Sequence, residues 1–117
     1  MLDLLDTPLR VTWDLNGPGG PVSGEAARHI ATALVEAGVF YVTLEERPLV
    51  HPDCTAILEI LAAGGCRSIA VCTGSAEELG ALEAGTRPAE LLLDVEPFLG
   101  DDGIDAAALD RTLARLR

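Results

Sequence analysis

Acidic side chains follow the apolar runs of this chain where the expected strands end. They are Asp14, Glu45, Glu46, Asp94 and Glu96, with His51 in a neighbouring loop. The carboxyl ends of parallel strands meet at one edge of a sheet, so these side chains would converge there. Converging carboxylates could hold Mg²⁺ or Mn²⁺, or act in acid–base chemistry if one of them were removed from water.

Asp14 and Asp94 are the stronger candidates of this acidic set. Each interrupts an apolar strand and would need a partner if it were buried, and Arg47 is the nearest plausible one. The alternative is a solvated rim, because acids at strand ends also cap helices and coat loops. A chain with 19 acidic residues places several of them there by chance, and the pattern favours this alternative.

A loop rich in glycine and proline spans residues 16–24. Its end overlaps the start of an expected helix, which begins with Ser23 as the N-cap. Backbone N–H groups at such a turn favour an anion, so Gly17, Gly19 and Gly20 could receive a phosphate or carboxylate. The two prolines remove N–H donors, and the pattern is neither G-x-G-x-x-G nor a Walker loop. A short structural turn is the simpler interpretation.

The three cysteines, Cys54, Cys66 and Cys72, fall in a helix, in a helix-to-strand turn and in a strand. Elements so far apart do not bring three thiolates to one cluster. An odd number also argues against a disulfide framework, so we expect three small thiols that are buried or half-buried. No catalytic triad and no zinc spacing is visible, and we assign no catalytic residue, metal ligand or cofactor.

Short β-rich runs alternate with segments of helical spacing four times along the chain. Strands are expected at 9–15, 40–44, 68–72 and 90–95, and helices at 23–38, 52–65, 75–85 and 105–117. Ser75 and Glu78 form the spacing of a capping box, in which each side chain satisfies a backbone N–H of the other residue. The last helix is expected to face inward with Leu109, Thr112, Leu113 and Leu116.

This order predicts an α/β fold of four βα units with a parallel sheet, half of a TIM-like (β/α) barrel. At 117 residues we expect one domain over 1–117, with 1–8 as an N-terminal extension. A half-barrel leaves the first and last strands and one sheet face without cover. Self-association or a protein partner would supply that cover.

The charge and composition of the chain limit the kinds of partner it can bind. The net charge is −11 and every basic residue is arginine, which argues against nucleic acid because phosphate binding needs a basic surface. Residues 1–8 lack the pattern of a secretory signal, and no segment is long and apolar enough to span a bilayer. We therefore expect a cytoplasmic protein without membrane contact.

Over residues 9–98 the chain resembles the first half of a radical S-adenosylmethionine (SAM) enzyme. The resemblance rests on the run 11–15, the loop after it, the run 42–44 and the segment 48–53. In that family the first loop carries C-x₃-C-x₂-C, which binds an iron–sulfur cluster, and here it has no cysteine. A Gly-Gly-Glu-Pro turn corresponds to residues 45–48, and a Thr-Asn-Gly strand end corresponds to Cys72, Thr73 and Gly74.

The resemblance implies a retained scaffold without its cluster. The leading hypothesis is therefore a non-catalytic protein that acts through protein contact, as a homodimer or an accessory subunit. A second hypothesis is a binder of a SAM- or nucleotide-like molecule at the strand ends. A third is a metal-dependent enzyme that uses Asp14, Asp94 and either Glu45 or Glu46.

Overall fold

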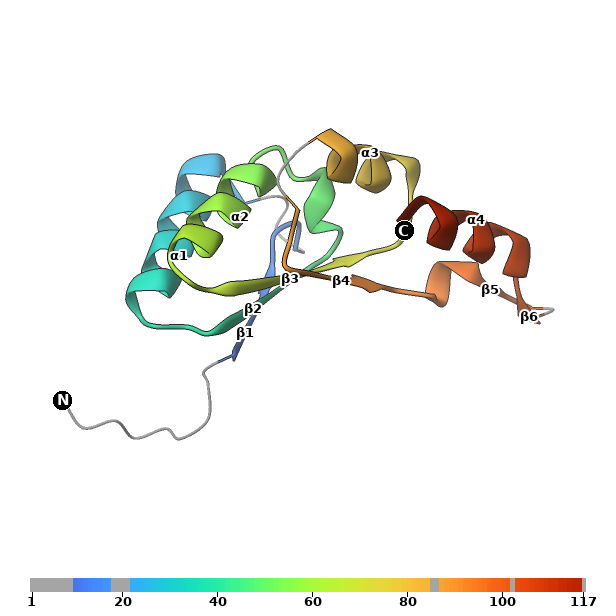
Figure 1. Ribbon diagram of the computed structural model, residues 1–117, viewed down its shortest axis with the longest axis horizontal. Coiled ribbons are helices and arrows are strands. Elements are labelled where there is room, and N and C mark those ends of the chain that lie inside the picture. Colours follow the sequence, from blue (N-terminus) through green and yellow to red (C-terminus); the bar gives the residue numbers. More distant parts are fainter. Residues whose placement is uncertain (1–9, 18–21, 85–86, 102, 117) are drawn as a thin grey trace.

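The computed structural model describes residues 10–17, 22–84, 87–101 and 103–116, and its centre is a sheet of four parallel strands (Figure 1). The strands are β1 (Arg10–Asp14), β2 (Tyr41–Glu45), β3 (Arg67–Cys72) and β4 (Glu90–Leu93). They lie in the order β1-β2-β3-β4, so neighbours in the sequence are neighbours in the sheet. The predicted α/β class with a parallel sheet is confirmed, whereas residues 1–9 lie outside the described residues.

The predicted helices are also present, as α1 (Gly24–Glu36), α2 (Cys54–Ala63), α3 (Ala76–Ala84) and α4 (Ala106–Leu116). The Ser23 hydroxyl caps α1 by accepting a hydrogen bond from the Ala26 amide at 3.2 Å. At α2 the cap differs from a standard one, because the Asp53 side chain makes no capping bond. Asp53 instead pairs with Arg28 of α1 at 2.9 Å, which joins the two helices.

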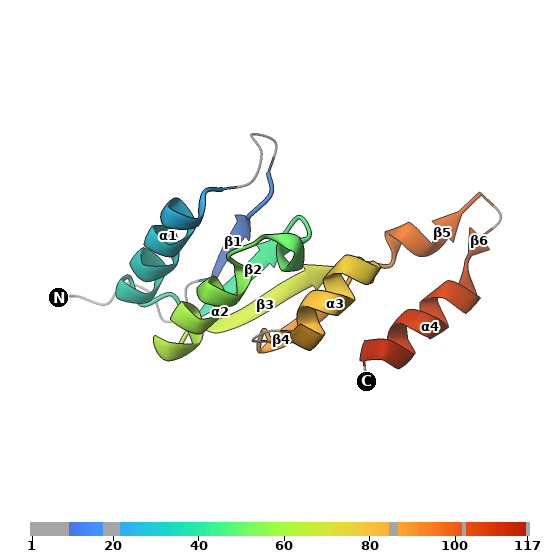
Figure 2. The ribbon, with the colours of Figure 1, turned by 90° about the horizontal axis from the view of Figure 1, so that it is seen from above.

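One face of the sheet carries the hydrophobic core, and α1, α2 and α3 lie over it (Figures 1 and 2). Val42, Leu44 and Ala70 of the two central strands are fully buried there. The predicted inward face of α2 is confirmed, since its apolar residues are all buried. These are Cys54, Ile57, Leu58 and Leu61.

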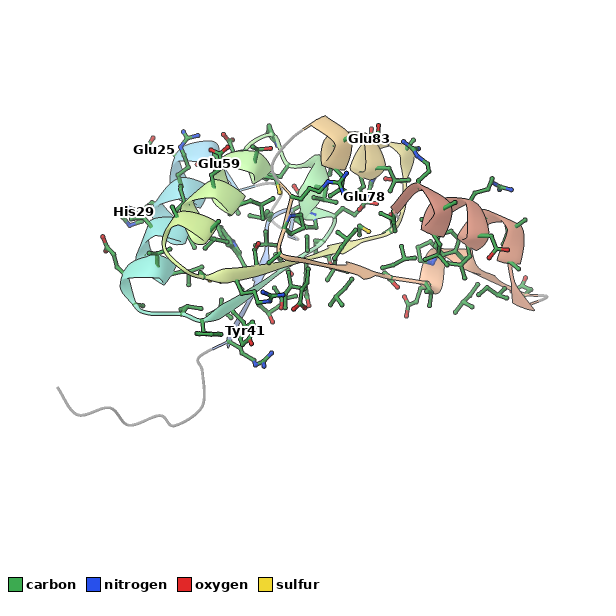
Figure 3. All side chains as sticks on the ribbon, viewed as in Figure 1. Glu25, His29, Tyr41, Glu59, Glu78 and Glu83 are labelled. Carbon is green, nitrogen blue, oxygen red and sulfur yellow. The ribbon has the colours of Figure 1, made fainter. Side chains whose placement is uncertain are left out.

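The other face of the sheet is more open in the described part of the chain. Figure 3 shows Tyr41 on this side, away from the helices. The Arg10 guanidinium lies 4.2 Å from the centre of the Tyr41 ring, and Arg67 pairs with Glu90 at 2.9 Å across β3 and β4. Leu92 of β4 is 49% exposed. A parallel sheet normally has both faces covered, so this face is unusual.

The segment after β4 contains secondary structure between the strand expected at 90–95 and the helix expected at 105–117, where none was predicted. It has a 3₁₀ turn, η2 (Glu96–Phe98), and a short antiparallel pair, β5 (Leu99–Gly100) and β6 (Gly103–Ile104). Phe98, the last residue of η2, is buried. The chain then returns as α4, which contacts η2 and lies beside α3 (Figure 2).

Helix α4 packs less completely than its spacing predicts. Thr112 is its buried residue, and Leu109 and Leu116 are half-buried. The expectation that Leu113 faces inward is wrong, because its side chain is 36% exposed. An ion pair of 3.1 Å between Arg115 and Glu83 holds the end of α4 against α3.

The sheet is not closed. Within the described residues β1 pairs only with β2, and β4 pairs only with β3. The part of the chain that the structure describes contains no helix of the length and apolarity that crossing a membrane requires.

Candidate functional site

The turn after β2 has an unusual backbone. Glu46 and Arg47 are consecutive residues with positive φ, at 58° and 54°. This left-handed region is unfavourable for residues with a Cβ atom, at roughly 1–3 kcal/mol each, and such strain concentrates at functional sites. It lies at the carboxyl edge of the sheet, where α/β proteins bind ligands.

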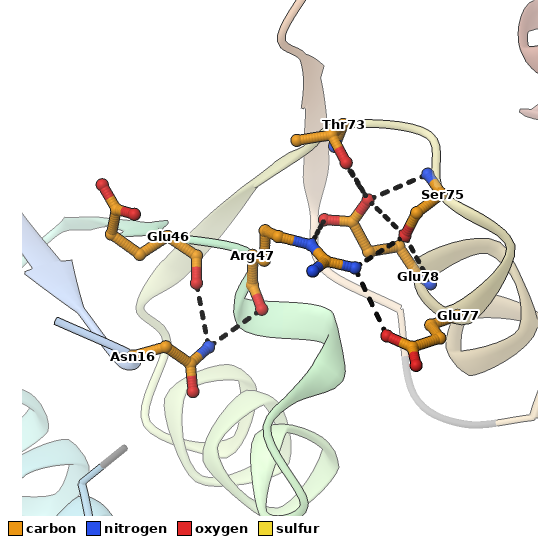
Figure 4. Close-up of polar contacts among 7 residues, drawn as sticks. All are labelled: Asn16, Glu46, Arg47, Thr73, Ser75, Glu77 and Glu78. Carbon is orange, nitrogen blue, oxygen red and sulfur yellow. Dashed lines mark hydrogen bonds and ion pairs between the residues drawn. The ribbon is translucent and has the colours of Figure 1, made fainter. Parts of the chain in front are cut away.

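Asn16, from the turn after β1, holds this backbone in place (Figure 4). Its side-chain amide donates to the carbonyl oxygen of Glu46 at 2.8 Å and to that of Arg47 at 3.0 Å. Asn16 was not among the residues singled out from the sequence. An asparagine in a loop carries no signal of its own unless the shape of the neighbouring loop is known.

The Arg47 side chain connects the same turn to the start of α3. Its Nη2 donates to the Ser75 hydroxyl at 3.0 Å and to a carboxylate oxygen of Glu77 at 3.3 Å, and its Nε lies 3.6 Å from Oε1 of Glu78 (Figure 4). Asp14 is exposed and Asp94 is half-buried, so neither needs the partner that burial would require. Two glutamates of α3 lie closer to Arg47 than either strand-end aspartate.

Glu78 is a fully buried charge at this edge. Its side chain is 0% exposed, and its Oε2 accepts hydrogen bonds from the amide and hydroxyl of both Thr73 and Ser75, at 2.7–3.1 Å. The Ser75 hydroxyl accepts from the Glu78 amide at 3.4 Å in return, so the predicted capping box is confirmed. Burial alone would raise the pKa of Glu78, but these hydrogen bonds outweigh it and hold the pKa below the usual value.

Together these contacts form one network across three strand ends, from Asn16 through Arg47 to Glu78. We call it the edge network. The oxygen Oε1 of Glu78 is buried and accepts no hydrogen bond from the described residues, and the Nε atom of Arg47 lies 3.6 Å from it, so Arg47 compensates the charge of this carboxylate. The network holds the loops at the carboxyl edge of the sheet in place. The positive charge of Arg47 is paired with Glu77 and Glu78 of α3.

Beside the edge network lies a shallow hollow of about 320 Å³. It is lined by Asp14, Asn16, Gly17 and Glu46, three of which were predicted site residues. The carboxylates of Asp14 and Glu46 in its wall would repel a bound anion. They favour a ligand group that donates hydrogen bonds or carries a positive charge. Gly19 and Gly20 lie outside the described residues.

The other predicted site residues take separate places. Asp94 accepts from the amide of Glu96 at 3.0 Å, so these two residues form a local turn after β4. Asp14 ends β1 at one side of the sheet and Asp94 follows β4 at the other. Within the described ranges no three acidic, histidine or cysteine side chains gather closely enough to hold a metal ion.

His51 and the three cysteines are buried inside the fold. The Asp53 amide donates to Nδ1 of His51 at 3.1 Å, which leaves Nε2 to donate to the Val22 carbonyl at 2.6 Å. Thus His51 ties the start of α2 to the residues before α1. The three cysteines are free and buried, as predicted, and burial raises the pKa of Cys54 to about 11.

Gly74 is a predicted site residue whose surroundings the sequence did not reveal. It has φ +81°, and a Cβ atom built on it would lie 2.5 Å from Cγ2 of Thr112. The loop that follows β3 therefore lies directly against α4. This contact joins the edge network to the last helix.

Asn16→Asp is expected to destabilise the protein by about 1–2 kcal/mol, because the strained turn loses both donors and gains a negative charge facing two carbonyl oxygens. Urea unfolding followed by circular dichroism measures the loss. Asp14→Asn is the control, because it replaces a carboxylate by an amide at an exposed strand end. It should change the free energy of unfolding by less than about 0.5 kcal/mol. Equal effects of the two substitutions would contradict the role of Asn16.

Comparison with known proteins found no matching family model, no matching curated protein and no matching solved structure.

Proposed function

We propose that this chain is a non-catalytic interaction module, a half-barrel of the radical SAM type that works by binding another protein surface. The observation that carries the proposal is the position of its exposed apolar side chains. Of the seven large hydrophobic residues that the described part of the chain exposes, five lie between β4 and α4. They are Leu92, Val95, Leu99, Ile104 and Leu113, and we call them the β4–α4 region.

Exposed apolar residues concentrated at one end of a molecule are typical of interaction surfaces. The edge network supports the same proposal, because it uses Arg47 and Glu78 to hold the fold together instead of leaving them to a substrate. The half-barrel is supported by the sequential strand order and by three helices on one face of the sheet.

A photoreactive benzoylphenylalanine placed at Leu113 tests this function in living cells. Illumination should yield a discrete covalent adduct with a protein, and Leu92→Glu in the same chain should abolish it. Ala62, exposed on α2, is the matched control position and should give no adduct. The absence of any protein adduct from position 113 would overturn the proposal.

The non-catalytic part of the proposal has its own test. After anaerobic reconstitution with iron and sulfide, the purified protein should show no visible absorbance from a bound cluster. Absorbance that stays with the protein through gel filtration would contradict it.

A second candidate function, binding of a small SAM- or nucleotide-like molecule, is favoured by the strained turn and the hollow beside it. Both lie at the edge where such ligands bind in α/β folds. Titration calorimetry with SAM, S-adenosylhomocysteine and adenosine nucleotides tests it. Heat that disappears in Asn16→Asp, with the fold retained, would support this candidate, and no heat from any of the three would reject it.

A further inference from the structure

The two outer strands of the sheet are incompletely covered on the helix side. Val11 and Trp13 of β1 and Leu91 and Leu93 of β4 point toward the core but are only half-buried. Their neighbours Val42 and Leu44 on β2 are fully buried. The helices therefore leave the apolar side chains of both edge strands only partly covered.

Helix α4 lies where it would cover a strand beyond β4. It follows α3 in the layer of helices, on the side away from α2 (Figure 2), and its apolar residues are half-buried or exposed. In right-handed βαβ connections a helix packs between the strand before it and the strand after it. Within the described residues β4 pairs only with β3, so its other edge is free.

We propose that a second copy of this chain supplies that strand: β4 of each copy pairs in parallel with β1 of the other, and the two half-barrels close into one eight-stranded barrel. This inference rests on the proposed function and names its partner. A two-fold rotation brings β4 of each copy beside β1 of the other copy. All four free edges are then paired, and the contact between these unlike edges closes into a ring of two copies.

The side-chain pattern and the charges select one register. Arg10, Thr12 and Glu90 lie on the open face, and Val11, Trp13, Leu91 and Leu93 lie on the helix side. Side chains alternate along strands, so only registers that match face to face keep apolar residues under α4.

Among these registers, opposite charges meet when Glu90 lies beside Arg10 of the second copy. The same arginine–glutamate pairing between neighbouring strands already occurs inside one chain, between Arg67 and Glu90. In this register Leu92 lies beside Thr12 of the second copy. The open face of each sheet becomes the barrel interior, which side chains such as Tyr41 and Ile69 would fill.

The test is a disulfide between the paired strands. The double variant Thr12→Cys, Leu92→Cys should form a covalent dimer under mild oxidation, visible on non-reducing gels. The native cysteines are buried and should not contribute. Thr43→Cys, Leu92→Cys is the matched control, because Thr43 lies on the same face of the inner strand β2, and it should stay monomeric on the gel.

Mixing the single variants Thr12→Cys and Leu92→Cys should also give a cross-linked dimer, which shows that the bond joins two chains. Light scattering of the unmodified protein should give twice the monomer mass. It is best done at moderate salt, since two copies of charge −11 repel each other at low ionic strength.

A monomeric mass together with no cross-link in the double variant would overturn the proposal, as would equal cross-linking of the Thr43 control. Circular dichroism of each variant checks that it has folded. An adduct at Leu113 with a different protein, in a chain that stays monomeric, would reject the second copy as partner and leave the interaction function standing.

Discussion

Glu78→Ala is expected to lower the free energy of unfolding by about 3 kcal/mol, the largest effect of any single change at the edge network. The substitution leaves the amides and hydroxyls of Thr73 and Ser75 without their shared acceptor and removes the buried partner of Arg47. Breaking a buried charged hydrogen-bond network typically costs this much. Chemical unfolding followed by tryptophan fluorescence and circular dichroism measures the loss.

Glu77→Ala is the matched control for this prediction. Glu77 is the next residue along the chain and also pairs with Arg47, but its side chain is 76% exposed. An exposed ion pair contributes about 0–1 kcal/mol, so this variant should stay close to the unmodified protein. If both variants lost the same stability, the buried network would not be what stabilises the start of α3.

The pH dependence of stability follows from the sign of the Glu78 shift. Its pKa in the folded protein lies below the ordinary value of 4.5, so the carboxylate binds its proton more weakly when folded than when unfolded. The stabilisation is therefore complete above the unfolded pKa and is lost as the pH falls through the folded pKa. The unmodified protein should lose more stability between neutral and strongly acidic pH than Glu78→Gln does.

Gly74→Ala is expected to cost about 2–4 kcal/mol. A Cβ atom at this position lies 2.5 Å from Thr112 and also sits on a backbone with φ +81°. Crowding in a packed contact costs about 1–3 kcal/mol and a left-handed backbone about 1 kcal/mol more. Thermal unfolding by calorimetry should show the decrease, and hydrogen exchange should increase in α4.

Two further variants isolate the cause of this effect. Thr112→Ala removes the methyl group and hydroxyl that the new Cβ would meet, so adding it to Gly74→Ala should recover the crowding part but leave the backbone strain. Gly80→Ala makes the same exchange within α3, where a new Cβ meets nothing within 4 Å, and should stabilise by about 0.5–1 kcal/mol. A destabilised Gly80→Ala variant would show that alanine is poorly tolerated for another reason.

The sequence predicted what depends on local periodicity. The four strands and four helices follow from alternating β-rich and helical runs, and the capping box of Ser75 and Glu78 follows from a spacing of three residues. The short pair β5 and β6 was missed because each strand has only two residues, too few to show any period.

The candidate site was harder to predict, because it depends on contacts between distant residues. The chain has 19 acids, and spacing alone could not select Glu77 and Glu78 as the partners of Arg47. Glu46 and Arg47 also adopt left-handed backbone without being glycines, so nothing in their residue types indicated that turn. The burial of Thr112 was predicted from helical spacing, but its contact with Gly74 and the contacts of Asn16 depend on loops that are close only in space.

The sheet has a direction, because its two free edges differ: one belongs to β1 and the other to β4. Units with unlike ends either join into a ring or add to one another without limit as a filament. Which of the two occurs depends on how sharply each sheet curves. In the proposed dimer the ring closes with two copies, and a change that flattened the four strands is expected to open that ring into a growing fibre.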